Sequence, residues 1–369
     1  MTSEVSGAER AVGPAERDAS DSVETSPAQG ADRADADRAG AGRAGAGGTA
    51  SPTTQRAVAL VAERRPQAED LGRQLSELTD EPDAFAVALR DGLVRLADDE
   101  YRAGQQRVAP GIGPVHGVRW PLLAAIERGL RNATRGQRTS PFLSLADRLF
   151  REPELEPRWV AFGLLERLVA DDPERAWQLL RRAAREAGDW ITVDSLAHPY
   201  GRGILLEPYR WAELEQLVYS RSPWERRLVG STIATIPFIE RRRGRDPAIV
   251  IRALPLVGQV MGDASPDVQK ALAWALRSLT MVDIETVSRF CEEQAARARA
   301  DDDGHRAWVV RDTLVKLPPA QAAALRATLA GIRRRPGAPS TSDAAGTAAQ
   351  FAEGAPEFDA TGFPEPPLT

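Results

Sequence analysis

Apolar residues recur at three- and four-residue steps along most of the chain between residues 56 and 335, the spacing of one face of a helix. No strand-like alternation of useful length competes with this pattern. It predicts helices over residues 85–96, 120–130, 157–169, 176–184, 211–218, 223–236, 249–260, 266–279, 282–298, 308–317 and 320–332. We therefore predict an all-α protein.

Prolines divide these segments at regular places. A proline can begin a helix, but it lacks the N–H group that continuation of a helix requires. We interpret the following as helix junctions: Pro153, Pro157, Pro173, Pro208, Pro223, Pro237, Pro247, Pro266 and Pro318. The run from His198 to Gly201, which contains Pro199, is likewise interpreted as a turn rather than a catalytic site.

Three of the predicted helices share a start, a length and an apolar rhythm. They begin at Pro157, Pro223 and Pro266, with 66 and 43 residues between successive starts. The second interval matches the roughly 40 to 47 residues of a HEAT-type helical pair, and the first leaves room for a pair plus an insertion. We predict a HEAT-like solenoid with one concave face, towards which the side chains of Arg227, Lys270 and Trp274 point.

The two ends of the chain differ in composition from this middle part. Residues 1–55 consist mainly of Ala, Gly, Asp, Arg, Ser and Thr, and residues 337–369 are rich in Pro, small and acidic residues. Such segments bury too little apolar surface to offset their chain entropy. We predict a disordered tail over 1–55, a solenoid domain over 56–336 and a second flexible tail over 337–369.

The charge balance changes when these tails are set aside. The whole chain has a net charge of -5, whereas residues 56–336 hold 43 basic and 39 acidic residues, a net charge of +4. This mildly basic domain permits a nucleic-acid partner without requiring one.

Few residues suited to metals or disulfides occur. One cysteine and three scattered histidines argue against a disulfide framework and against a metal site. No apolar run reaches the roughly 18 residues of a membrane-spanning helix, and no signal peptide is recognisable. We expect a monomeric, cytoplasmic protein without a metal.

One acidic residue stands out because of its aromatic neighbour. Trp190 and Asp194 are four residues apart, so a helix places both on one face. Burying an unpaired carboxylate costs on the order of several kcal/mol, so this acid is solvated, paired or retained for chemistry. Taken alone, such a pair is most often a solvated face or a helix cap. Other tryptophans are interpreted as packing residues: Trp159, Trp177, Trp211, Trp224 and Trp308.

Four motifs in a fixed order carry a resemblance to a known family. They are Gly117–Pro121, Trp190–Ala197, Ser222–Arg227 and Gln269–Arg277. Together they resemble the AlkD-like DNA alkylation repair family, which consists of HEAT-like-repeat alkylpurine DNA glycosylases. The resemblance extends from about Leu89 to Leu317.

The resemblance implies a function and a set of site residues. Asp194 matches the catalytic aspartate, Trp190 and Trp274 match tryptophans that flank the lesion, and Arg227 matches a phosphate-contacting arginine. The implied partner is double-stranded DNA that contains N3- or N7-alkylated purines, with no cofactor and with the protein at the nucleoid when bound. Helical spacing alone adds three further candidates for backbone contacts: Lys270, Arg226 and Arg277.

Two alternatives and one departure from the family pattern remain at this stage. The chain could bind damaged or branched DNA without excising a base, or it could be an α-solenoid scaffold for a protein partner. The departure is Asp189, an acid where an uncharged residue is expected and where it would repel a phosphate. The sequence does not separate small methyl adducts from bulky ones.

Overall fold

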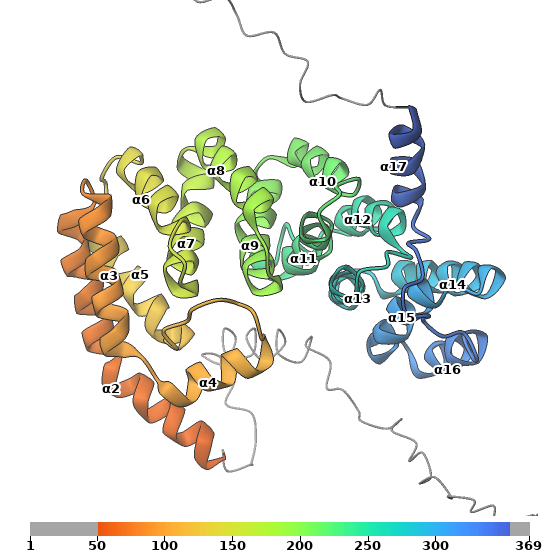
Figure 1. Ribbon diagram of the computed structural model, residues 1–369, viewed down its shortest axis with the longest axis horizontal. Coiled ribbons are helices and arrows are strands. Elements are labelled where there is room, and N and C mark those ends of the chain that lie inside the picture. The colour runs from red at the N-terminus through yellow and green to blue at the C-terminus, as the bar shows by residue number, and fades with distance from the viewer. Residues whose placement is uncertain (1–50, 355–369) are drawn as a thin grey trace, which may run out of the picture.

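Residues 51–354 are described by the computed structural model, and they fold into helices with no strand among them (Figure 1). The helices are α2 (Pro52–Leu75), α3 (Pro82–Leu96), α4 (Asp99–Val108), α5 (Trp120–Ala133), α6 (Ser140–Phe150), α7 (Leu155–Asp171), α8 (Pro173–Glu186), α9 (Trp190–Leu206), α10 (Trp211–Leu217), α11 (Pro223–Ile239), α12 (Pro247–Val260), α13 (Pro266–Leu279), α14 (Ile284–Asp301), α15 (Gly304–Thr313), α16 (Pro319–Thr328) and α17 (Asp343–Gly354). The all-α prediction is confirmed.

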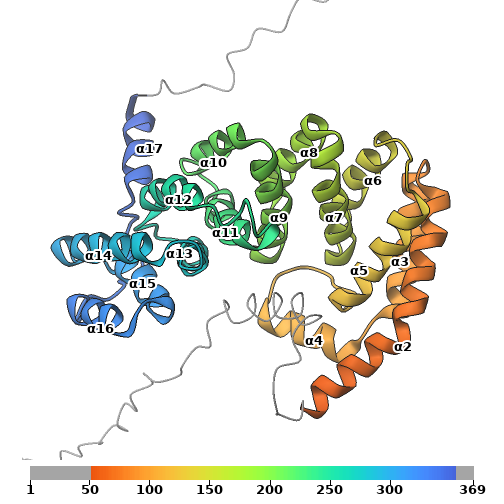
Figure 2. The same ribbon diagram turned by 180° about the vertical axis from the view of Figure 1, so that it is seen from behind.

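The helices stack in two layers along a curved array. Helices α5, α7, α9, α11, α13 and α15 form the inner layer, in which each packs against the next. Helices α6, α8, α10, α12, α14 and α16 form the outer layer, as the two opposite views show (Figures 1 and 2). Most of the array shares one continuous apolar core. This arrangement confirms a helical-repeat solenoid, and its inner layer carries Asp194.

Prolines mark helix starts, but they do not always mark helix ends. Helices α8, α11, α12 and α13 each begin with the proline that the sequence indicates. However, Pro199 lies inside α9 and Pro237 lies inside α11, so the predicted turn at 198–201 and the predicted junction at Pro237 are wrong. Both prolines are buried. Packing against neighbouring helices therefore maintains each helix despite its missing N–H group.

The N-terminal boundary lies a few residues earlier than predicted. Helix α2 begins at Pro52, and the Ser51 hydroxyl accepts a hydrogen bond from the Thr54 N–H at 3.2 Å. A serine cap followed by proline is a strong helix-start signal, which the compositional argument overlooked. The rest of the predicted N-terminal tail, residues 1–50, lies outside the described residues.

The predicted flexible tail from residue 337 is wrong for its first part. The Thr341 N–H donates to the Gly262 carbonyl at 2.9 Å, and the Thr341 hydroxyl donates to buried Asp303 at 2.5 Å. Helix α17 then packs on α12, and Arg297 pairs with Asp343 at 2.8 Å. These partners come from distant helices, so composition could not reveal them. Residues 355–369 lie outside the described part of the chain.

Helices α2 and α5 approach each other closely at two glycines. A Cβ atom added to Gly129 would lie 2.2 Å from the Glu69 carbonyl oxygen, and one added to Gly72 would lie 2.1 Å from the Ile126 carbonyl oxygen. Both obstacles are backbone atoms, which cannot rotate away. The absence of a side chain at these two positions is thus what permits the contact between α2 and α5.

Replacing Gly129 by alanine is expected to destabilise the fold. The added methyl group must push α2 and α5 apart, so the free energy of unfolding should fall by about 3 kcal/mol in chemical denaturation. Gly104→Ala in α4 is the matched control, because nothing lies within 4 Å of an added Cβ atom there. That control should gain up to about 1 kcal/mol, since alanine favours a helix more than glycine does. Equal stability of the two variants would contradict the close contact.

Candidate active site

Helix α9 begins at Trp190 because the preceding acid caps it. The Asp189 carboxylate accepts hydrogen bonds from the Thr192 N–H at 2.8 Å and from the Thr192 hydroxyl at 2.6 Å. Arg158 lies 3.7 Å from the same carboxylate. An N-cap carboxylate satisfies orphan N–H groups and favours the positive end of the helix dipole. The unexpected acid before Trp190 therefore has a structural role.

One turn later, Asp194 points from α9 towards α11. Its carboxylate accepts two hydrogen bonds from Arg227, from Nε at 3.0 Å and from Nη2 at 2.7 Å. The Ser231 hydroxyl donates a third at 2.6 Å. The Asp194 side chain is 12% exposed and the Arg227 side chain is 6% exposed. Of the three states that the sequence allows for this acid, the structure shows the paired one.

Arg227 joins three successive helices of the inner layer. Besides its two bonds to Asp194 on α9, its Nη1 donates to the Asp267 carbonyl on α13 at 2.7 Å. Its guanidinium carbon also lies 5.8 Å from the centre of the Trp190 ring. A bidentate pair of this kind fixes both position and orientation. The guanidinium is thus directed at Asp194 and holds its carboxylate in place. The phosphate contact that the family resemblance implies for Arg227 stays a prediction.

Trp190 lies against a small apolar cluster that is separate from the main core. The cluster consists of Ala109, Ile112, Val115 and Leu155, with Trp159, Trp190 and Ile191 packed against it. Three of its members belong to the glycine-rich segment between α4 and α5. This segment thus packs against the side chain of Trp190. The sequence pattern gave no indication of the contact.

The glycine-rich segment is held by a single buried carboxylate. Glu156, which is fully buried, accepts hydrogen bonds from the N–H groups of His116 at 3.0 Å, Gly117 at 2.7 Å and Val118 at 3.1 Å. Gly117 has a φ of 83°, the left-handed conformation that glycine adopts readily. The motif from Gly117 onwards thus has a structural basis, since its backbone wraps around Glu156.

Glu156→Gln is expected to loosen this segment. An amide offers one acceptor oxygen where the carboxylate offers two, and it carries no charge, so stability should fall by about 2 to 4 kcal/mol in chemical denaturation. Amide exchange at residues 116–118 should rise at the same time. Glu154→Gln is the matched control, because Glu154 makes only a long pair to Arg90 at 3.6 Å and should cost less than about 1 kcal/mol. Identical losses in both variants would remove the special role of Glu156.

Two further predicted residues lie on α13, the helix that Arg227 reaches through Asp267. Trp274 is 8% exposed and packs within the main core, two turns after Asp267. Lys270 is half-buried between them. The described residues include no carboxylate that pairs with Lys270. Trp190 thus lies directly beside the Asp194–Arg227 pair, whereas Trp274 belongs to the adjacent helix and is largely covered.

Arg226 and Arg277, which helical spacing predicts as DNA-backbone contacts, each pair with a carboxylate in this structure. Arg226 pairs with buried Asp263 at 2.6 Å and donates to the Ser220 carbonyl at 2.7 Å. Arg277 is only 6% exposed and pairs with Asp312 on α15. Both guanidiniums bind carboxylates of neighbouring segments, which helical spacing alone cannot reveal.

The tryptophans assigned to packing do have that role. Trp177 and Trp211 are buried, and Trp159, Trp224 and Trp308 are partly buried against the main core. The Trp159 ring also makes an edge contact with Trp120, and its indole N–H donates to the Ser195 hydroxyl at 2.7 Å. The rings of Trp120 and Trp159 line a cavity of about 190 Å³ between α5, α7 and α9. Ser195, the residue that follows Asp194, also lines this cavity.

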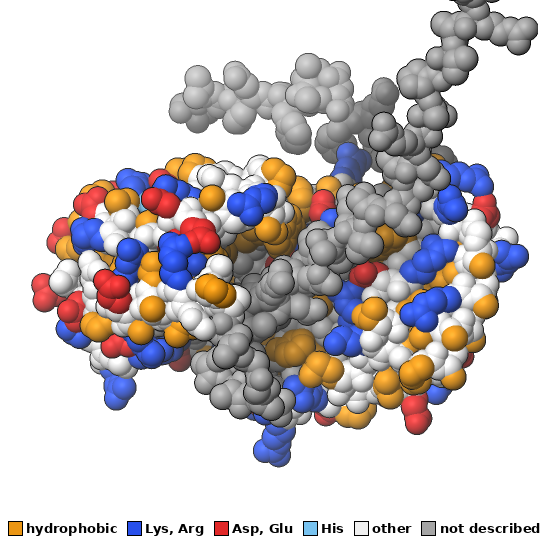
Figure 3. Space-filling view, turned by 90° about the horizontal axis from the view of Figure 1, so that it is seen from below, with side chains coloured by type: hydrophobic (Ala, Val, Ile, Leu, Met, Phe, Trp, Pro, Cys, Tyr) orange, Lys and Arg blue, Asp and Glu red, His pale blue; other side chains and the backbone are white. Residues whose placement is uncertain are grey.

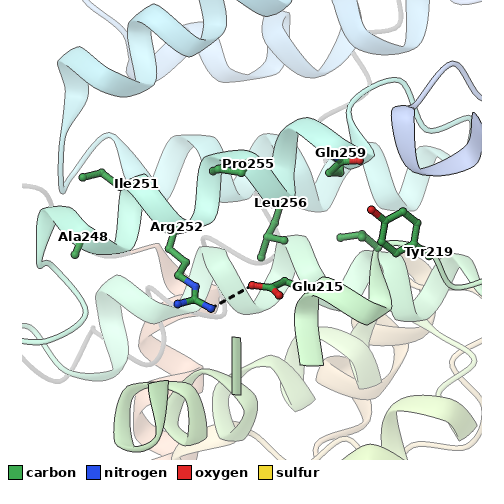
Figure 4. A pocket seen from close by; sticks show the side chains of 9 residues that line it. Glu215, Tyr219, Ala248, Ile251, Arg252, Pro255, Leu256 and Gln259 are labelled. Atoms are coloured by element: carbon green, nitrogen blue, oxygen red, sulfur yellow. Dashed lines mark hydrogen bonds and ion pairs between the residues drawn. The ribbon is translucent and has the colours of Figure 1, made fainter. Parts of the chain in front are cut away.

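The charges on the face seen from below Figure 1 are mixed. Figure 3 shows that Lys and Arg side chains are interspersed with acidic and apolar ones over the visible part of this face. A cavity of about 720 Å³ lies elsewhere, between α10 and α12 in the outer layer (Figure 4). Within residues 51–354, no group of three His, Cys, Asp or Glu side chains is placed to hold a metal ion. No helix in that range combines the length and apolarity needed to cross a bilayer.

Comparison with known protein families gives a match. The family described as "DNA alkylation repair enzyme" matches residues 89–306. The matched region runs from within α3 into α15 and contains Asp194, Arg227 and both tryptophans assigned to the site. No curated protein matches the chain.

Proposed function

Because the chain belongs to the family of DNA alkylation repair enzymes, we propose that it hydrolyses the N-glycosidic bond of cationic N3- or N7-alkylpurines in duplex DNA. The family gives it a role in DNA repair with DNA as its partner. The observation that carries the finer proposal is the Asp194 carboxylate, held by Arg227 and Ser231 beside the Trp190 ring. We place this activity in the cytoplasm, on the chromosome, in a HEAT-like monomer.

The chemistry requires little more than a fixed negative charge. An alkylated purine is already cationic, so the bond from the sugar to the base can break with its electron pair leaving on a neutral purine. Positive charge then develops on the deoxyribose, and the Asp194 carboxylate stabilises it. Water adds to the anomeric carbon and loses a proton, for which the same carboxylate is a suitable acceptor. The reaction as proposed needs no metal and no cofactor.

Arg227 and Trp190 support this role in different ways. The two charge-assisted bonds from Arg227 orient the carboxylate. The face of an indole attracts a cationic nucleoside by about 0.5 to 2 kcal/mol. Of the four cations predicted for the site, the half-buried Lys270 on α13 is the one without a carboxylate partner among the described residues, and it is therefore the best suited to a phosphate contact.

One observation favours a second candidate function, DNA binding without excision. The Arg227 guanidinium neutralises much of the charge of Asp194 in a largely buried pair. A neutralised carboxylate stabilises a developing cation less than a free one does. A protein that only recognises damaged or branched DNA would retain such a pair for structural reasons.

An assay for free base separates these two functions. The full chain would be incubated with duplex DNA that contains N7-methylguanine or N3-methyladenine, with a chelator present, and released base would be measured together with strand breaks. Release of base without a strand break supports the proposed glycosylase. Tight binding without release supports the second candidate, whereas neither binding nor release would overturn both.

A further inference from the structure

A cavity of about 260 Å³ lies where the turn between α5 and α6 meets the end of α7. These three helices are neighbours in the N-terminal half of the array (Figure 1). Three arginines line the cavity: Arg131 at the end of α5, Arg135 in the turn and Arg167 on α7. The turn is tight, because the Gln137 N–H donates to the Thr134 carbonyl at 3.1 Å. It thus brings Arg135 to the same cavity as Arg131, which lies one helical turn earlier.

These arginines have no ion-pair partner among the described residues. Within residues 51–354, no hydrogen bond or ion pair joins Arg131, Arg135 or Arg167 to another residue. Arg167 is half-buried, and its guanidinium carbon lies 4.9 Å from the centre of the Phe142 ring. Such a contact leaves the N–H groups of the guanidinium available to an acceptor. The arginines of the candidate active site, by contrast, each bind a carboxylate.

The electrostatic surroundings of Arg167 are unfavourable for its charge. Burial lowers the pKa of its guanidinium from the ordinary value, and the positive charge of Arg131 lowers this pKa further. Asp171, which also lines the cavity, and Glu127 act in the opposite direction without reversing the effect. A half-buried cation beside a second cation costs free energy unless an anion compensates them. An anion bound in this cavity therefore stabilises both arginines.

A phosphate group is the anion that fits this arrangement. The side chains that line the cavity carry three positive charges and one negative charge. Guanidinium groups bind phosphate oxygens through pairs of parallel N–H bonds, and a phosphate offers more oxygens than a carboxylate does. We propose that Arg131, Arg135 and Arg167 form a binding site for a phosphate group. This site shares no residue with the candidate active site.

The phosphate has two sources, the backbone of bound DNA and a free phosphate compound. Arg167 lies eight residues after Trp159 on α7, a helical rise of about 12 Å. Trp159 in turn donates to Ser195, the neighbour of Asp194. The major groove of DNA is also about 12 Å wide, so a duplex with one strand at Asp194 can present its other strand near Arg167. The backbone source rests on the proposed function, because it takes Asp194 to lie at the DNA.

A titration with inorganic phosphate tests the site itself. The full chain, without DNA, would be titrated at constant ionic strength while the side-chain Nε–H signal of Arg167 is followed by NMR. Replacing Arg131 and Arg135 together by glutamine should weaken phosphate binding about tenfold or more, since two charged donors are lost. Both residues are exposed, so the fold should persist, which circular dichroism verifies. Arg138→Gln is the matched control, because Arg138 is exposed in the same turn but does not line the cavity.

Binding of undamaged duplex DNA at several salt concentrations then identifies the source. If the backbone supplies the phosphate, the double glutamine variant should show a salt slope shallower by about one, whereas Arg138→Gln should keep the wild-type slope. An unchanged slope together with weakened binding of inorganic phosphate identifies a free phosphate compound as the ligand. Wild-type behaviour of the double variant in both titrations would overturn the proposal, as would equal losses in Arg138→Gln.

The proposed function is tested apart from this site. Base release from duplex DNA that contains N7-methylguanine would be measured on the same protein samples. Absence of base release would contradict the glycosylase proposal and would leave the phosphate titration unaffected, because that titration involves neither DNA nor a damaged base.

Discussion

Asp194→Asn will lower the rate of base release by about 100- to 1000-fold while the protein stays folded and still binds duplex DNA. Asparagine has nearly the shape of aspartate, and its one carbonyl oxygen can still accept the hydrogen bonds from Arg227 Nε and from Ser231, although its amide group cannot accept the bond from Arg227 Nη2. What it lacks is the negative charge that stabilises a cationic sugar. Single-turnover release of N7-methylguanine from duplex DNA measures this effect, and circular dichroism verifies the fold.

Asp189→Asn is the control that separates catalysis from charge in general. It removes one negative charge only five positions away, and asparagine caps a helix about as well as aspartate does. This variant should therefore release base at close to the wild-type rate. If the two asparagine variants are equally active, Asp194 has no part in the reaction and its pairing with Arg227 is purely structural.

Arg227→Ala will have the second large effect, and that effect should fall on both stability and excision. Removing one partner of a largely buried ion pair leaves a carboxylate without compensation, which costs about 3 kcal/mol or more. The carboxylate also loses its orientation, and a displacement of about 1 Å is enough to slow a reaction about 100-fold. Chemical denaturation and base release measure the two consequences separately.

A double variant and a salt titration identify the cause. Replacing Asp194 and Arg227 together should be less destabilising than Arg227→Ala alone, because no unpaired carboxylate remains. The salt dependence of DNA binding should be unchanged in Arg227→Ala, since this guanidinium contacts a carboxylate. Lys270→Ala should instead make the slope shallower by about one. A shallower slope for Arg227→Ala would support the phosphate contact that the family resemblance implies.

Much of the fold could be predicted from local sequence. The helical spacing of apolar residues and the prolines at helix starts predicted several of the helices. For example, the predicted range of α13 agrees with the observed Pro266–Leu279. The interior prolines Pro199 and Pro237 were misread because local propensity disfavours them, whereas packing on both sides of α9 and α11 outweighs that preference.

The candidate site was predicted only as far as single helices allow. Trp190 and Asp194 share a face of α9 through simple spacing, but the partner of Asp194 depends on how α11 is offset against α9. The same holds for Arg277. Its spacing from Trp274 predicts which face of α13 it shares, but not that its guanidinium pairs with Asp312 on α15. The support of Gly117 by Glu156 joins residues 39 apart and was equally hidden. Contacts between repeats follow from superhelical geometry, which no local pattern encodes.

The bridge from Asp194 through Arg227 to Asp267 joins three neighbouring helices of the inner layer, α9, α11 and α13, with one rigid, planar group. Any change in the pitch or curvature of the array between α9 and α13 therefore rotates the carboxylate. Under the proposed function, bending of the array by a bound duplex would change the orientation of the Asp194 carboxylate, and DNA binding and base release would then be coupled.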